Sequence, residues 1–187
     1  MSGIIKGRRS KLILFIIAAA TAAAVFAIIY YSGILLPHYA VWHDVTISGD
    51  DENEPDEIIL KNRRLKVYKD GVNVFEAPKS LRVQNVLYTD IDRDGSREMI
   101  LLNFNLGRYG DHRPFWVRFD PSVWRQHIYI YDYYADKRSF RPIWMASDIG
   151  MEAADCVMED KQVLMLTDSN GVQTRWMWIS FGLRCVD

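Results

Sequence analysis

A run of 25 residues without a charged side chain, at positions 12–36, most constrains how this chain can fold. As an α-helix the run would be roughly 37 Å long, enough to cross a hydrocarbon core of about 30 Å with some tilt. The residues before it are basic, which favours the cytoplasmic side for that end: Lys6, Arg8, Arg9 and Lys11. We therefore expect a cytoplasmic tail at 1–11, a transmembrane helix at 12–36 ended by Pro37, and an extracytoplasmic remainder.

A cleaved signal peptide is the alternative interpretation, because Ala22, Ala23 and Ala24 would suit a signal peptidase. The apolar run continues for twelve residues after Ala24, longer than a signal peptide requires, which favours an uncleaved anchor. A single span argues against a transporter or channel. Beyond position 11 the chain has 19 basic and 24 acidic residues, a balance that argues against a nucleic-acid partner.

Residues 89–101 of the remainder, Thr-Asp-Ile-Asp-Arg-Asp-Gly-Ser-Arg-Glu-Met-Ile-Leu, combine alternating carboxylates with a glycine. Hard cations such as Ca²⁺ bind six to eight oxygen atoms, which such a loop can supply. The flanks at 81–88 and 99–104 are rich in Val, Leu and Ile and are typical of strands. The pattern predicts a calcium loop between two strands, and the alternative is a solvated acidic turn that binds no metal.

This stretch resembles the D-x-D-x-D-G-x-x-[DE] loop of FG-GAP/VCBS repeats, which form the blades of integrin-type β-propellers. The resemblance implies Ca²⁺ as a structural cofactor, bound by acidic side chains and one main-chain carbonyl. The implied ligands are Asp90, Asp92, Asp94, the carbonyl of Ser96, and Glu98.

Short strands at close spacing follow the juncture at 37–56 and predict an all-β domain at 57–187. The first blade-sized unit would use 57–61, 64–69, 72–75 and 81–88, and the second 99–104, 115–119, 127–133 and 140–145. Alternation at 127–131 places Ile128 and Ile130 on one face and the tyrosines on the other. A third, incomplete unit would have strands at 163–167 and 173–183, with 41–47 possible as an added strand.

Closed propellers have four to eight blades, so the expected fold is a partial or atypical β-propeller-like assembly of antiparallel sheets. The acidic turn within 49–57 is open to two interpretations, a solvated linker or a worn second metal loop. A second worn copy, at 154–166, lacks too many ligands to bind a metal. Cys156 and Cys185 lie on the exported side, as a disulfide or as two independent thiols.

Sequence motifs for catalysis are absent, and the aromatic content is high, with 6 Trp and 10 Tyr. Tryptophan and tyrosine supply large contact areas in binding sites, although such rings also fill β cores. The residues expected to bind a ligand are Tyr109, Trp116, Trp124, Trp176 and Trp178.

The expected function is therefore a single-pass, membrane-anchored calcium-binding β module that binds an envelope protein or glycan without catalysis. One alternative is an envelope hydrolase acting on cell-wall polymer, with Asp111 and His112 as acid–base candidates. The other is a structural subunit that completes its fold against a partner chain.

Overall fold

The computed structural model describes residues 2–146 and 148–186; the side chains of residues 2–10 and of His112 lie outside the described part. The chain forms two compact units, divided after Pro37. The first contains helix α1 (Ser2–Ser32), whose segment Lys11–Ser32 is long and apolar enough to cross a membrane. The helix ends four residues earlier than predicted, because Gly33 adopts a φ of 76°, a left-handed conformation that ends helices.

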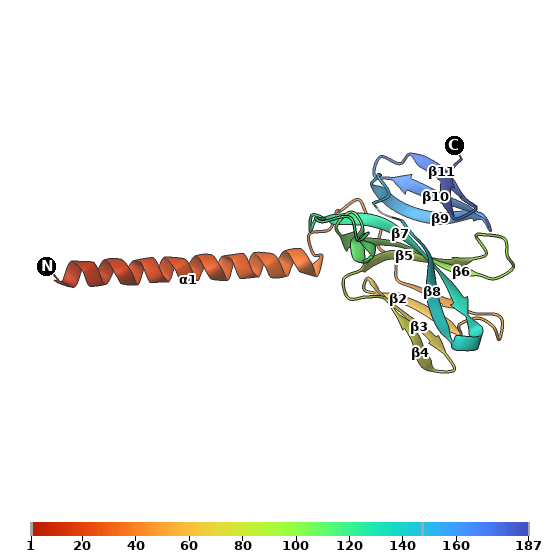
Figure 1. Cartoon of the computed structure of the whole chain (residues 1–187), viewed down its shortest axis with the longest axis horizontal. Helices are drawn as coiled ribbons and strands as arrows, with labels where there is room; N and C mark the ends of the chain where they lie inside the picture. The colour runs from red at the N-terminus through yellow and green to blue at the C-terminus, as the bar shows by residue number, and fades with distance from the viewer. Residues whose placement is uncertain (1, 147, 187) are drawn as a thin grey trace. The chain divides into compact units, whose positions relative to one another are not determined.

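The second unit consists of three antiparallel sheets, each a meander of four strands (Figure 1). The first sheet contains β1 (Val45–Ser48), β2 (Glu57–Lys61), β3 (Arg64–Lys69) and β4 (Val72–Glu76). The second contains β5 (Arg82–Thr89), β6 (Glu98–Leu106), β7 (Trp124–Tyr134) and β8 (Ser139–Met145). The third contains β9 (Ala153–Asp160), β10 (Val163–Asp168), β11 (Gln173–Ile179) and β12 (Gly182–Cys185).

The expected all-β class is confirmed, but the grouping of strands differs from the prediction. Strand β5 begins the second sheet instead of closing the first, and β1 pairs with β2 instead of extending the last sheet. The segment predicted as a linker therefore contains a strand and its hairpin turn. Residues 115–119 form no strand, since the flanking Pro114 and Pro121 cannot donate to a ladder. The sheets do not close into a barrel within the described residues, and a propeller-like fold stays a prediction.

The second sheet is the middle layer, and it is buried on both faces. One face places Met99, Leu101, Tyr129 and Tyr131 in a cluster with the first sheet. The other face places Ile100, Leu102, Ile128 and Ile130 in a cluster with the third sheet. The predicted division of Ile128 and Ile130 from the tyrosines is therefore confirmed. Burial of both faces explains why β6 is a nearly continuous apolar run.

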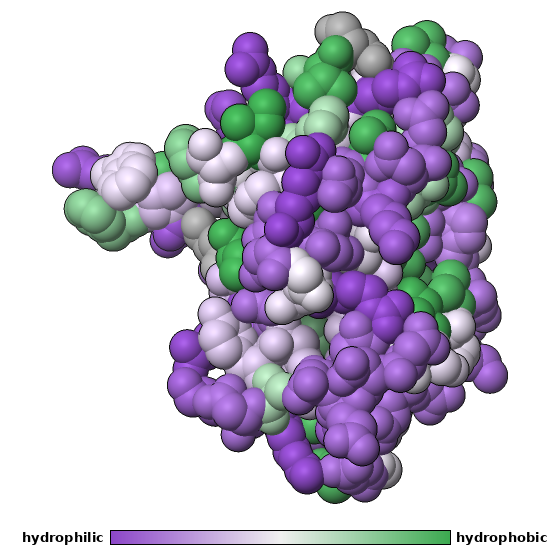
Figure 2. Space-filling view, turned by 90° about the vertical axis from the view of Figure 1, so that its right-hand side faces the viewer, coloured by the Kyte–Doolittle hydropathy of each residue, from purple (hydrophilic) through white to green (hydrophobic). Residues whose placement is uncertain are grey.

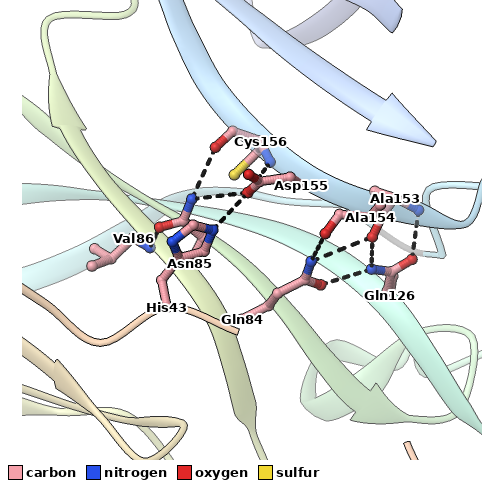
Figure 3. A network of polar contacts seen from close by, with 9 residues as sticks. All are labelled: His43, Gln84, Asn85, Val86, Gln126, Ala153, Ala154, Asp155 and Cys156. Atoms are coloured by element: carbon pink, nitrogen blue, oxygen red, sulfur yellow. Dashed lines mark hydrogen bonds and ion pairs between the residues drawn. The ribbon is translucent and has the colours of Figure 1, made fainter. Parts of the chain in front are cut away.

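Amide side chains hold the third sheet against the second (Figure 3). Gln126 donates to the carbonyl of Ala153 at 2.6 Å and accepts from the amide of the same residue at 2.8 Å. Gln84 donates to the carbonyl of Ala154 at 2.6 Å, and Asn85 donates to that of Cys156 at 2.9 Å. These buried polar groups thus replace the backbone partners that the first strand of the third sheet lacks at its edge.

Candidate metal centre

The acidic loop connects β5 to β6, so the predicted loop between two strands is confirmed. Two of its residues adopt left-handed conformations, Arg93 with a φ of 73° and Gly95 with a φ of 93°. Glycine adopts this conformation at no steric cost, which explains its place at the sixth position of the loop. The chain can therefore reverse direction within eight residues and return its carboxylates toward one another.

Backbone amides of the loop fix the three aspartates. Asp90 accepts a hydrogen bond from the amide of Arg93 at 2.8 Å, and Asp92 accepts one from Asp94 at 3.1 Å. Asp94 in turn accepts one from the amide of Ser96 at 2.7 Å. Each of these bonds uses one carboxylate oxygen, Oδ1. The second oxygen of each group keeps its capacity to bind a cation.

Glu98 occupies an unusual environment for a carboxyl group, since it is 1% exposed at the first position of β6. Its Oε2 accepts a hydrogen bond from the amide of Ile91 at 2.9 Å. Burial, followed by the negative charge of Asp92, Asp94 and Asp90, raises the pKa of Glu98 to about 8. The carboxyl therefore holds a proton at neutral pH unless a cation takes the proton's place.

Asp90, Asp92 and Glu98 each offer a carboxylate oxygen, and these three atoms lie within 4.8 Å of one another. Calcium binds oxygen at about 2.3–2.6 Å, so two ligands of one ion lie at most roughly 5 Å apart. The three oxygen atoms can therefore contact a single ion. Three of the five predicted ligands are thus close enough together to contact one hard cation.

The other two residues of the predicted site, Asp94 and Ser96, are exposed. Asp94 lies outside the group of three carboxylates, and a role for the Ser96 carbonyl stays a prediction. A fifth carboxylate, that of Asp132 on β7, was missed by the sequence analysis. Burial and the charge of Asp94 raise the pKa of Asp132. The missing signal is the strand register: Met99 pairs with Tyr131, so Asp132 comes next to Glu98 across the sheet.

The acidic turn between β1 and β2 interacts with the same loop through Arg97. This guanidinium forms an ion pair with Glu54 and a longer one, 3.4 Å, with Asp50. The turn is therefore a structural neighbour of the loop rather than a linker. Its carboxylates contact a guanidinium, an arrangement that does not favour a second metal site there.

The aromatic residues predicted to bind a ligand do not converge on one groove. Trp176 and Trp178 pack against the cluster between the second and third sheets. The other three belong to residues 107–124, the connection between β6 and β7 together with the first residue of β7. There Trp116 is 70% exposed, Trp124 lies under the guanidinium of Arg82 at 5.5 Å, and Tyr109 lies beside that of Arg108 at 5.9 Å.

The residues considered for catalysis and for a disulfide have other surroundings. The exposed carboxylate of Asp111 accepts a hydrogen bond from Ser80 at 2.9 Å, and the side chain of His112 lies outside the described part. Cys156 and Cys185 are free thiols, so the disulfide interpretation is wrong for this structure. They lie on the two edge strands, β9 and β12, of one sheet, at a separation of roughly 14 Å across three strand spacings, too far for a bond.

Comparisons with known proteins add no family to this description. No protein-family model, no curated protein and no solved structure matches the chain. The likeness of the acidic loop to FG-GAP/VCBS repeats therefore stays a prediction.

Proposed function

We propose that this chain is a single-pass membrane protein whose extracytoplasmic β domain binds one structural Ca²⁺ ion. The observation that supports it best is the convergence of Asp90, Asp92 and Glu98, whose oxygen atoms lie within 4.8 Å of one another. The apolar segment Lys11–Ser32 supports the anchor. The basic residues before it favour a cytoplasmic N-terminus.

The ion would act on stability rather than in chemistry. Without it, several carboxylates face one another at the end of a buried sheet, and Glu98 is neutral only because it holds a proton. Calcium would neutralise these charges and release that proton. It would thereby hold the β5–β6 hairpin in place beside Asp132 of β7.

Thermal unfolding of the full chain in lipid nanodiscs, with calcium or with chelator, tests this proposal. A ligand at 100 times its Kd stabilises by about 2.7 kcal/mol, which corresponds to a Tm shift of roughly 5–10 °C for a domain of this size. In Asp92→Ala we expect the Tm in calcium to fall to that of the chelated parent protein. Asp136→Asn, in the exposed turn after β7, is the matched control and should retain the shift. A parent Tm that is the same in calcium and in chelator refutes the metal site.

We also propose that the domain binds an envelope protein or glycan without catalysing a reaction. The supporting feature is a hollow of about 310 Å³ beside the third sheet, lined by Trp144, Trp176, Leu183 and Asp148 among others. Two indole rings with one carboxylate suit a sugar ring or an apolar side chain of a partner. Fluorescence titration with wall-glycan fragments, compared between the parent and Trp176→Phe, tests this part.

A further inference from the structure

The β domain has two chemically different ends. In an antiparallel meander, successive connections alternate between the ends of the sheet. The anchor-side end consists of residues 38–44, 61–64, 77–82, 107–125, 146, 148–152 and 168–172. The metal-loop end consists of residues 49–57, 69–72, 89–98, 132–138, 159–162 and 180–181. Strand β5, with 8 residues, runs from one end to the other, a distance of about 23 Å.

Contacts between the sheets confirm this division. At the anchor-side end, the amide of Val83 donates to Arg63 at 3.1 Å, and that of Asp148 donates to Arg108 at 2.8 Å. At the metal-loop end, the hydroxyl of Thr89 donates to the carbonyl of Lys161 at 2.9 Å. The connections of all three sheets therefore gather at the same two ends.

Charge is segregated between these ends. The anchor-side segments contain nine basic and six acidic residues, whereas the metal-loop segments contain six basic and fifteen acidic residues. Figure 2 views the domain from the side where the β5–β6 hairpin lies in Figure 1, and most of that surface is hydrophilic. The domain is thus positive at one end and strongly negative at the other.

The positive end is where the chain joins the domain from α1. Tyr39 donates to the side-chain oxygen of Gln126, at 3.3 Å, and the amide of Val41 donates to Ala154 at 2.9 Å. Only six residues lie between Ser32, the last residue of α1, and Tyr39, and the seven backbone steps from Ser32 to Tyr39 span at most about 25 Å. The tether therefore keeps Tyr39 within that distance of the last residue of α1.

The connection between β6 and β7 adds exposed apolar rings to this end. Phe115, Trp116 and Phe119 are 94%, 70% and 80% exposed. The rings of Phe115 and Trp116 contact each other, with centroids 4.8 Å apart. Arg113 and Arg118 flank them and are exposed. Aromatic rings beside arginines are typical of segments that enter the interface of an anionic bilayer.

A hollow next to these rings is large enough for a lipid headgroup. It has a volume of about 510 Å³, and its lining includes Arg108, Arg125, Asp120 and Asp148. Arg125 lies 3.6 Å from Asp148, so its charge is partly compensated. The guanidinium of Arg108 is exposed beside the ring of Tyr109. Phosphate binds guanidinium groups through charge-assisted hydrogen bonds.

We propose that the β6–β7 connection binds the anionic lipid surface of the membrane in which α1 is anchored. Phe115, Trp116 and Phe119 enter the headgroup region, and Arg108, Arg113 and Arg118 bind lipid phosphates. This inference rests on the proposed function in one respect, that α1 spans the membrane.

Quenching of tryptophan fluorescence by brominated lipids tests the proposal with the full chain in nanodiscs. All six tryptophans belong to the β domain, and α1 has none. In discs that contain an anionic lipid, we expect the parent protein to be quenched more than Trp116→Phe. The conservative replacement keeps an aromatic ring and removes only one reporter. Trp178→Phe, in β11 of the third sheet, is the matched control and should retain the quenched component.

Charge is tested separately with Arg113→Gln/Arg118→Gln. Two arginines near an anionic surface together contribute a factor of roughly 30 to the contact equilibrium, so quenching of Trp116 should be lost in this variant. It should also be lost for the parent in discs of phosphatidylcholine alone. Lys137→Gln/Lys161→Gln, at the metal-loop end, is the charge control and should leave quenching unchanged.

Two failures are distinguishable. A chain extracted from membranes by alkaline carbonate would overturn the anchor and the lipid contact together. A chain that resists extraction, but whose quenching in anionic discs is the same with and without Trp116, would overturn the lipid contact alone.

Discussion

The buried Glu98 carboxyl leads to an unusual prediction for the calcium-free protein, namely that its stability falls as the pH rises. Its pKa in the folded chain is raised from 4.5 to about 8. A proton held more tightly in the folded state stabilises that state, so the contribution is present at low pH and is lost between pH 4.5 and about 8. By proton linkage, this difference between the folded and unfolded pKa values lowers the free energy of unfolding by about 3.5 kcal/mol between pH 5 and pH 8.

The assay is denaturant unfolding of the full chain in chelator at several pH values, for the parent and for Glu98→Gln. Glutamine keeps an oxygen that can accept the hydrogen bond of Ile91, and it has no proton to lose. Other titrating groups contribute equally to both proteins, so the difference between the two curves isolates Glu98. Asp136→Asn, an exposed acid at the same end of the domain, should follow the parent curve.

Calcium should reverse the pH dependence of stability, because a bound ion would hold Glu98 in its ionised form. Below pH 8 the ion must displace a proton, so calcium affinity should rise by about 50-fold between pH 6 and pH 8. Above pH 8 it should level off. If the calcium-free parent and Glu98→Gln share the same pH dependence, the assigned environment of Glu98 is wrong.

Two further predictions concern the third sheet. Gln126→Leu leaves the buried amide of Ala153 without its side-chain partner and should lower the free energy of unfolding, measured with denaturant, by about 1–3 kcal/mol. The exposed Gln173→Leu is the control. Equal losses of stability in the two variants would contradict the role of Gln126. Cys185 is exposed, whereas Cys156 is buried and has a raised pKa. In intact cells whose outer layer is permeable, a membrane-impermeant maleimide should therefore label the protein at Cys185 alone. Labelling only after lysis would contradict the extracytoplasmic orientation.

Local patterns in the sequence predicted the parts of this fold that depend on neighbouring residues. Alternation at Ile128 and Ile130 predicted the two faces of β7, because the side-chain period of a strand is two. The charge-free run predicted a membrane-crossing helix in nearly the correct place. Its end was wrong, since the left-handed conformation of Gly33 ends a helix before Pro37 can do so.

Features that depend on pairing between distant segments were not predictable in the same way. Residues 153–160 contain three acids and resemble a worn metal loop, yet they form β9. Their partners are the side chains of Gln84, Asn85 and Gln126, which lie 27 or more positions away in sequence. Asp132 was missed for the same reason, because only the register of β6 with β7 brings it to the loop.

The buried polar groups of the middle sheet differ in how their burial is compensated, and this difference favours a cation at Glu98. Gln84, Asn85 and Gln126 are neutral, and each donates a hydrogen bond to a β9 carbonyl, so their burial is compensated. Glu98 is buried as deeply, but it has one amide donor, Ile91, and several carboxylates around it. A buried carboxyl group whose burial is not compensated by hydrogen bonds is expected where a bound ligand supplies the compensation. A proton neutralises Glu98 alone, whereas a divalent ion that contacts Asp90, Asp92 and Glu98 would offset two of their three negative charges.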